Sequence, residues 1–143
     1  MRPKEAAVPL QLRICIDVED LEKGIAFYRD AFGLTPGRRL GRKWAEMLGG
    51  PAPIDLLAER AGTAPLPGSA AAVRDYRRHW TPVHLDWPVP DLDAALRRAQ
   101  AAGASLEGEV RQKKWGRLAL LADPFGNGFC LLELQGAGYD ALL

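Results

Sequence analysis

The sequence has no long hydrophobic run, few cysteines and no dominant charge, and each absence excludes a class of protein. None of its apolar stretches approaches the roughly 20 residues that a transmembrane helix needs. Residues 1–10 contain charges and two prolines but lack the apolar core of a signal peptide. The 19 Lys and Arg residues nearly balance the 18 Asp and Glu residues. The total charge therefore gives no reason to expect a nucleic acid or an anionic membrane as partner.

The two cysteines, Cys15 and Cys130, have neither the spacing of a metal-binding motif nor the density of a disulfide scaffold. We therefore expect a cytoplasmic protein with reduced thiols. The sequence also shows no nucleophile-plus-base pattern, phosphate loop or dinucleotide fingerprint, and the pair Gly49-Gly50 is typical of a turn. At 143 residues the chain can form one compact unit that buries about two-thirds of its unfolded surface.

The clearest local pattern is the sequence DPFGN at residues 123–127, which stands between two leucine-rich runs. Proline fixes φ at the value that the second position of a turn requires, and the glycine and asparagine tolerate the positive φ that closes it. The flanking runs, residues 117–122 and 128–134, have the length and composition of strands. This stretch therefore predicts a β-hairpin near the end of the chain.

The sequence predicts the same order of strands and helix in each half of the chain. In residues 11–18 apolar and polar side chains alternate, as in a strand with one face on a core. Asp20 can cap a following amphipathic helix, which is expected to end at Gly33. The expected strands are 11–18, 38–41, 43–48 and 54–59 in the first half, and 82–87, 106–113, 115–122 and 128–134 in the second, whose helix runs from Asp91 to near Gly103.

The two halves superpose by a shift of 71 residues, which places Asp20-Leu21 on Asp91-Leu92, Lys43-Trp44 on Lys114-Trp115 and Arg13 on His84. A constant shift across a helix cap and a strand indicates internal duplication. Each half reads β-α-β-β-β and is too small to bury its own sheet face, so the two must share a core. We therefore expect an α+β domain at residues 11–134, with module one at 11–60, a linker at 61–81, module two at 82–134, and tails at 1–10 and 135–143.

The linker is too long for a featureless loop in a compact domain. We expect part of it to be helical or to pack as a lid, with Tyr76 and Trp80 packed rather than exposed. In the C-terminal tail, Tyr139 and the closing leucines are expected to dock against the domain or a partner.

The paired modules resemble the vicinal oxygen chelate superfamily, which includes glyoxalase I, extradiol dioxygenases and bleomycin-resistance proteins. The likeness rests on VEDL at 18–21, AFYRDAFGL at 26–34 and ADPFGNG at 122–128 closing on Leu132-Glu133. It covers residues 11–134 and implies a mixed sheet that curls around one concave cavity. It identifies the fold more closely than the reaction, because one fold hosts many chemistries.

In metal-using relatives the ligands come from the first and last strands of each module. By position these are Arg13 and His84 in the first strands, and Glu133 in the last strand of module two. In module one the position falls on Ala58 if the leucine pairs are aligned, whereas strand alternation from Asp55 leaves Glu59 as an alternative. His84 and Glu133 are suitable donors for zinc, nickel, manganese or iron, with Glu59, Asp86 or Asp17 as candidates for a third donor.

Arg13 cannot bind a metal because its guanidinium offers only hydrogen-bond donors. Alternation places Glu133 on the strand face opposite Leu132 and Leu134, and we expect Arg13, His84 and Glu133 to project into one cavity. An Arg13–Glu133 ion pair would then fill the metal position and could hold an anionic oxygen through a bidentate fork.

Two classes of function follow. The first is a binding protein that holds an aromatic or anionic small molecule without a complete metal site, with Arg13, Trp44, His84, Trp115 and Glu133 as ligand-binding residues. The second is a metal-assisted lyase, isomerase or dioxygenase in which His84 and Glu133 are catalytic. The count of suitable donors favours the first class. Because exposed sheet edges are stabilised by pairing, we also expect a homodimer with the linker or the C-terminal tail at the contact.

Overall fold

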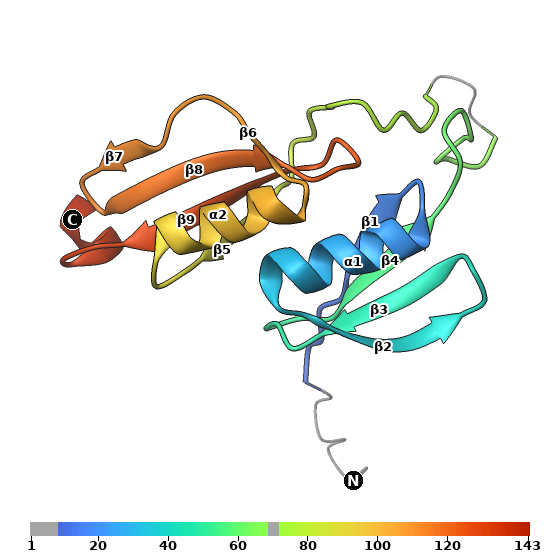
Figure 1. The fold of residues 1–143 in the computed structure, drawn as a ribbon, viewed down its shortest axis with the longest axis horizontal. Coiled ribbons are helices and arrows are strands. Elements are labelled where there is room, and N and C mark those ends of the chain that lie inside the picture. Colours follow the sequence, from blue (N-terminus) through green and yellow to red (C-terminus); the bar gives the residue numbers. More distant parts are fainter. Residues whose placement is uncertain (1–8, 69–71) are drawn as a thin grey trace, which may run out of the picture.

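The computed structural model describes residues 9–68 and 72–143 as an α+β domain of two modules, each with a strand, a helix and a further run of strands, which confirms the predicted fold class (Figure 1). The first sheet has the strand order β1-β4-β3-β2, and the second has the order β5-β9-β8-β6 with β7 paired to β8. The elements of module one are β1 (Ile14–Val18), α1 (Leu21–Phe32), β2 (Thr35–Leu40), β3 (Trp44–Leu48) and β4 (Ile54–Ala58). Those of module two are β5 (Leu85–Pro88), α2 (Leu92–Ala102), β6 (Ser105–Leu106), β7 (Arg111–Lys113), β8 (Gly116–Ala122) and β9 (Gly128–Leu134).

The repeat is visible in the strand register. Each first strand pairs in parallel with its module's last strand, Ile14 opposite Ile54 and Leu85 opposite Phe129. Ile14 and Leu85 are 71 residues apart, as predicted, whereas Ile54 and Phe129 are 75 residues apart. The shift therefore grows along the chain, because the segment between the first and last strands is longer in module two.

Both helices begin and end where capping chemistry predicts. The carboxylate of Asp20 accepts a hydrogen bond from the backbone N–H of Lys23 at 3.0 Å, and Asp91 accepts one from Ala94 at 3.1 Å. Gly33 and Gly103 close the helices with φ values of 70° and 117°, a region that residues with a Cβ avoid.

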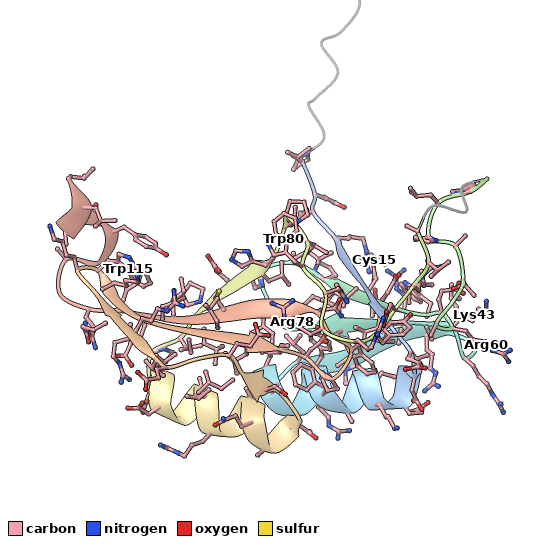
Figure 2. The ribbon with its side chains drawn as sticks, turned by 90° about the horizontal axis from the view of Figure 1, so that it is seen from above. Cys15, Lys43, Arg60, Arg78, Trp80 and Trp115 are labelled. Atoms are coloured by element: carbon pink, nitrogen blue, oxygen red, sulfur yellow. The ribbon has the colours of Figure 1, made fainter. Side chains whose placement is uncertain are left out.

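The two helices pack on the same side of the sheets, and the core lies between these layers (Figures 1 and 2). The largest fully buried side chains are Val18, Phe27, Met47, Ile54, Leu56, Leu92, Leu121 and Leu131. Leu21 and Ile25 are also buried, which agrees with the predicted helix face. The opposite side of the sheets carries no α-helix among the described residues, so polar and apolar groups can gather there around a ligand.

Several local expectations need correction. The strand expected at 106–113 is divided into β6 and β7, and the described part of the linker contains no helix. Trp80 is 80% exposed instead of packed, because the linker carries it above the sheets on the side away from the helices (Figure 2). Tyr139 lies in a 3-10 helix, Gly138–Leu142, and its ring contacts Trp115 with centroids 5.3 Å apart. Among the described residues no helix has the length and apolar character needed to cross a membrane.

Candidate functional site

A cavity of about 710 Å³ opens between the two edge strands that face each other, β1 of module one and β5 of module two. Its walls come from β1, the end of α1, β5, the start of β9 and several linker residues. The described linker segment from residue 72 onward thus contributes side chains to the cavity wall. The cavity reaches from the helix-free side of the sheets down to aromatic residues of the core.

Aromatic rings form one wall of this cavity. Phe32 and Trp87 stack with centroids 4.2 Å apart and planes 17° apart, and Tyr28 stacks on Phe32 at 5.7 Å. Trp80 adds a fourth ring from the linker, and Figure 2 shows it on the helix-free side together with Cys15. Stacked rings of this kind present flat apolar faces, which suit a flat apolar ligand.

Polar groups fasten the linker over the cavity. The Nε of Arg74 donates to Asp17 Oδ2 at 2.8 Å, and the Nε2 of His79 lies 3.0 Å from Asn127 Oδ1. The Nδ2 of Asn127 donates in turn to the backbone oxygen of Asp17 at 3.3 Å. The linker is therefore attached to β1 and to the hairpin turn by side chains that also line the cavity.

The DPFGN turn joins the two modules at the wall of this cavity. The buried carboxylate of Asp123 accepts hydrogen bonds from the backbone N–H groups of Phe125 at 2.8 Å and Asn127 at 3.0 Å. Its other oxygen accepts from Asn127 Nδ2 at 2.9 Å and from the hydroxyl of Tyr28, on α1, at 2.7 Å. The aspartate that shapes the turn thus also fixes the position of a cavity-lining tyrosine from the other module.

Arg13 does not meet Glu133. Its guanidinium binds Asp55 on β4 through two bonds of 2.9 and 2.6 Å, and Glu46 on β3 at 2.8 Å. Arg38, through its side chain and backbone N–H, and then Arg13 lower the pKa of Glu46 to about 2. The arginine is therefore occupied by two carboxylates of its own module.

Glu133 lies on the helix side of β9, because Phe129 and Leu131 are the residues of this strand that face the core. Its Oε2 accepts the backbone N–H of Leu92 at the start of α2 at 2.7 Å, and Arg117 lies 3.5 Å away. The N–H of Leu92, followed by Gln135 and Arg117, lowers the pKa of Glu133. The expected cavity shared by Arg13, His84 and Glu133 is therefore not formed.

The remaining predicted site residues lie in separate places. The strand register aligns Ala58, and not Glu59, with Glu133, and Glu59 instead lies 3.6 Å from Lys43. Trp44 begins β3 and Trp115 precedes β8, and neither lines the large cavity. Of the five predicted ligand-binding residues, the structure places His84 alone in the wall of that cavity.

His84 lies beside groups that the sequence interpretation did not combine with it. Its Nε2 is 3.0 Å from Asp86 Oδ1, and Asp86 is the register partner of Cys130 on β9. One donor atom from each of these three residues lies within 4.8 Å of the others. Cys130 faces the helix-free side because Phe129 and Leu131 face the core, and the sequence alone did not indicate which apolar side of β9 would do so.

Comparison with known proteins agrees with the fold. The model of the "Glyoxalase-like domain" family matches residues 13–132. The anthracycline biosynthesis protein DauV of Streptomyces sp. (strain C5) is 37% identical over 121 residues, which are 83% of this chain and 39% of that protein. DnrV of Streptomyces peucetius, with the same description, is 43% identical over 81 residues, 57% of this chain and 26% of that protein. The chain thus spans about two-fifths or less of the length of these curated relatives.

Solved structures show the same architecture at low sequence identity. The fosfomycin resistance protein FosX from Listeria monocytogenes has a TM-score of 0.69 at 17% identity, covering 96% of this chain and all of that one. Lactoylglutathione lyase from Agrobacterium tumefaciens has a TM-score of 0.59 at 20% identity, covering 92% of this chain and 96% of that one. At these identities the likeness shows the fold and leaves the chemistry to the residues of this chain.

Proposed function

The chain belongs to the glyoxalase-like domain family of the vicinal oxygen chelate superfamily, and we propose that it binds a flat polycyclic aromatic molecule of the anthracycline type. The observation that carries this proposal is the cavity of about 710 Å³ with its stacked aromatic wall. Drug-sized ligands occupy cavities of roughly 300–1,000 Å³ that are mostly apolar with a few polar groups. The descriptions of DauV and DnrV support the ligand class.

The side chains that line the cavity can contact both the flat faces and the polar edges of such a ligand. Fused aromatic rings can stack against Phe32, Trp87 and Trp80, which removes apolar surface from water. The ring oxygens of a hydroxylated quinone need hydrogen-bond partners, and the imidazole of His84 in the cavity wall can act as a donor. Arg13, the residue first expected to bind an anionic group, is already held by Asp55 and Glu46.

A homodimer and a cytoplasmic location stay predictions. The edge strands β1 and β5 and the apolar side chains of Leu12 and Val83, which are 67% and 76% exposed, support the dimer. Unpaired strand edges and exposed apolar groups favour association. Light scattering at high micromolar concentration should give twice the chain mass, and a monomeric mass there would contradict this prediction.

The binding proposal can be tested with a hydroxylated anthraquinone by equilibrium dialysis and tryptophan fluorescence. We expect saturable binding of one molecule per chain. Trp80→Ala should weaken it about two- to tenfold, because one aromatic stacking pair contributes roughly 0.5–1.5 kcal/mol. Trp44→Phe is the matched control, since Trp44 lies outside the cavity wall. Unsaturable binding, or equal weakening by both substitutions, would contradict the proposal.

A further inference from the structure

The cavity of the proposed aromatic site continues into a second, smaller hollow against β8 and β9. This hollow has a volume of about 190 Å³, well above the roughly 30 Å³ that one water molecule occupies in the liquid. The two spaces share five wall residues, Trp80, Thr81, His84, Gly128 and Phe129. A ligand that stacks its rings in the larger cavity can therefore place a short side group in the smaller hollow.

The smaller hollow has an arginine in its wall, Arg78 of the linker, which does not line the larger cavity. Its Nε donates to Glu107 Oε2 at 2.6 Å, and its Nη2 donates to Glu107 Oε1 at 2.9 Å. Its Nη1 donates to the backbone oxygen of His79. A guanidinium has five N–H groups, and these bonds use three of them. One N–H on each terminal nitrogen thus has no partner among the described residues.

The position of this guanidinium depends on the glycine at the start of β9. A Cβ at Gly128 would lie 2.6 Å from Nη2, 3.0 Å from Cζ and 3.1 Å from Nη1 of Arg78. Because these three distances are similar, the guanidinium lies with its flat face against the strand. Figure 2 shows Arg78 nearer the strands than Trp80, which stands out on the helix-free side. The guanidinium is therefore held against the strand, beside a wall residue that both spaces share.

The charges around the smaller hollow favour a neutral group over an anion. The hydrogen bonds from Arg78 lower the pKa of Glu107, so this carboxylate is ionised at neutral pH and balances the arginine. A second carboxylate, Asp86, lies 3.0 Å from His84 in the hollow wall. An anionic side group would therefore meet no excess of positive charge, whereas a neutral oxygen can still accept the free N–H groups of Arg78.

We propose that the bound aromatic molecule carries a neutral carbonyl side group, a ketone or an ester, which enters the smaller hollow and accepts a hydrogen bond from Arg78. This inference rests on the proposed function, because the rings of the same molecule occupy the larger cavity. It adds a specificity-determining residue outside the aromatic wall and narrows the ligand class. The guanidinium selects the side group, and Glu107 sets its charge.

The first experiment compares three derivatives of one hydroxylated anthraquinone, which carry an acetyl, an isopropyl or a carboxylate group at the same ring position. The three groups are similar in size, but only the acetyl group is a neutral acceptor. In wild type we expect the acetyl derivative to bind about tenfold more tightly than the isopropyl derivative, because a hydrogen bond to a charged group contributes a factor of this order. We expect the carboxylate derivative to bind less tightly than the acetyl derivative.

The second experiment tests whether Arg78 and Glu107 cause this preference. Arg78→Met should reduce the affinity ratio of acetyl to isopropyl derivative to about one or less. Arg77→Met is the matched control, because it removes the same charge from a side chain that is 89% exposed and lies outside both walls. Glu107→Gln should raise the affinity for the carboxylate derivative about tenfold relative to the acetyl derivative, because Arg78 then has no anionic partner. A residue that only supported the linker would not change this ratio.

Equal binding of the acetyl and isopropyl derivatives by wild type would overturn the inference, and so would a preference that persists in Arg78→Met. The wild-type comparison and Glu107→Gln leave Arg78 unchanged, so they decide the matter even if Arg78→Met does not fold. These results are ratios between ligands with the same rings, whereas the proposed function depends on whether the rings bind. Failure of all three derivatives to bind would contradict the proposed function and this inference together.

Discussion

Removing the hydroxyl of Tyr28 is expected to weaken the connection between the two modules by a measurable amount. This hydroxyl, on α1, donates to Asp123 Oδ2 at 2.7 Å in a buried setting. Burial and the neighbouring Asp123 raise the pKa of Tyr28 well above its usual value, so the phenol remains a donor at neutral pH. A hydrogen bond to a charged group contributes about 1.5–3 kcal/mol to stability. Tyr28→Phe should lower the free energy of unfolding by about that amount and leave no void beyond one oxygen atom.

The size of the loss is limited by the other partners of the carboxylate. Asp123 keeps three further donors, the N–H groups of Phe125 and Asn127 and the amide of Asn127, so it stays solvated by the protein when the hydroxyl is removed. Asp123→Asn should cost more than Tyr28→Phe, because an amide nitrogen would then face groups that also donate. The double variant should lose less than the sum of the two, by at least about 0.5 kcal/mol, because the residues share one interaction.

The assay is equilibrium urea unfolding at pH 7, followed by far-ultraviolet circular dichroism. Tyr139→Phe is the matched control, because its ring is 49% exposed and lies in the C-terminal 3-10 helix. We expect the control to change stability by less than about 0.5 kcal/mol. If Tyr28→Phe cost no more than this control, the Tyr28–Asp123 hydrogen bond would not be the connection described here.

Three further predictions follow from single side chains. The hydrogen bonds from Arg38 contribute most to lowering the pKa of Glu46 from 4.5 to about 2. The stabilisation by this carboxylate is therefore present above pH 4.5 and is lost as the pH falls toward 2. Urea unfolding across this range should show a smaller loss of stability in Glu46→Gln than in wild type, and parallel curves would contradict this. Leu131 is 1% exposed, and Leu131→Ala should lower the free energy of unfolding by about 2–5 kcal/mol in the same assay. A smaller loss would show that the surrounding side chains can close the space left by the leucine. Burial, followed by the charge of Asp86, raises the pKa of Cys130 to about 11. An aromatic disulfide reagent at pH 7 should therefore react with the exposed Cys15 before Cys130. Equal reaction rates of the two thiols would contradict this prediction.

Local chemistry accounts for the parts of the fold that the sequence predicts well. Asp20 and Asp91 are aspartates before apolar helices, and Gly33 and Gly103 are glycines after them, so the helix ends follow from single residues. The repeat by 71 residues holds in the first strands and at both helix starts. It does not hold in the later strands. Trp44 pairs with Leu57 in module one, and the residue of module two that corresponds to Leu57 by register is Leu132, which pairs with Leu118 and not with Trp115. Loop length, which the shift assumes to be constant, differs between the modules.

The site was less predictable because its partners are distant in the sequence. Arg13 binds the carboxylates of Asp55 and Glu46, which are 42 and 33 residues away in the sequence. No local sequence pattern distinguishes these two carboxylates from the others. Trp80 was expected to be packed, yet it is 80% exposed and lines the cavity. The linker decides this, because it crosses the gap between β1 and β5 and brings Trp80 above it.

The alternation of side chains along β9 follows from the order of residues alone, so Glu133 faces away from Leu132 and Leu134 in any fold that contains this strand. It did not determine which face meets the core, because Phe129 and Leu131 on one side are as apolar as Leu132 and Leu134 on the other. Packing against the helices decided that choice, and it directed Glu133 to the start of α2 and Cys130 toward His84. A strand with two apolar faces leaves its orientation to the layer that covers it, and here that layer determined which residues belong to the site.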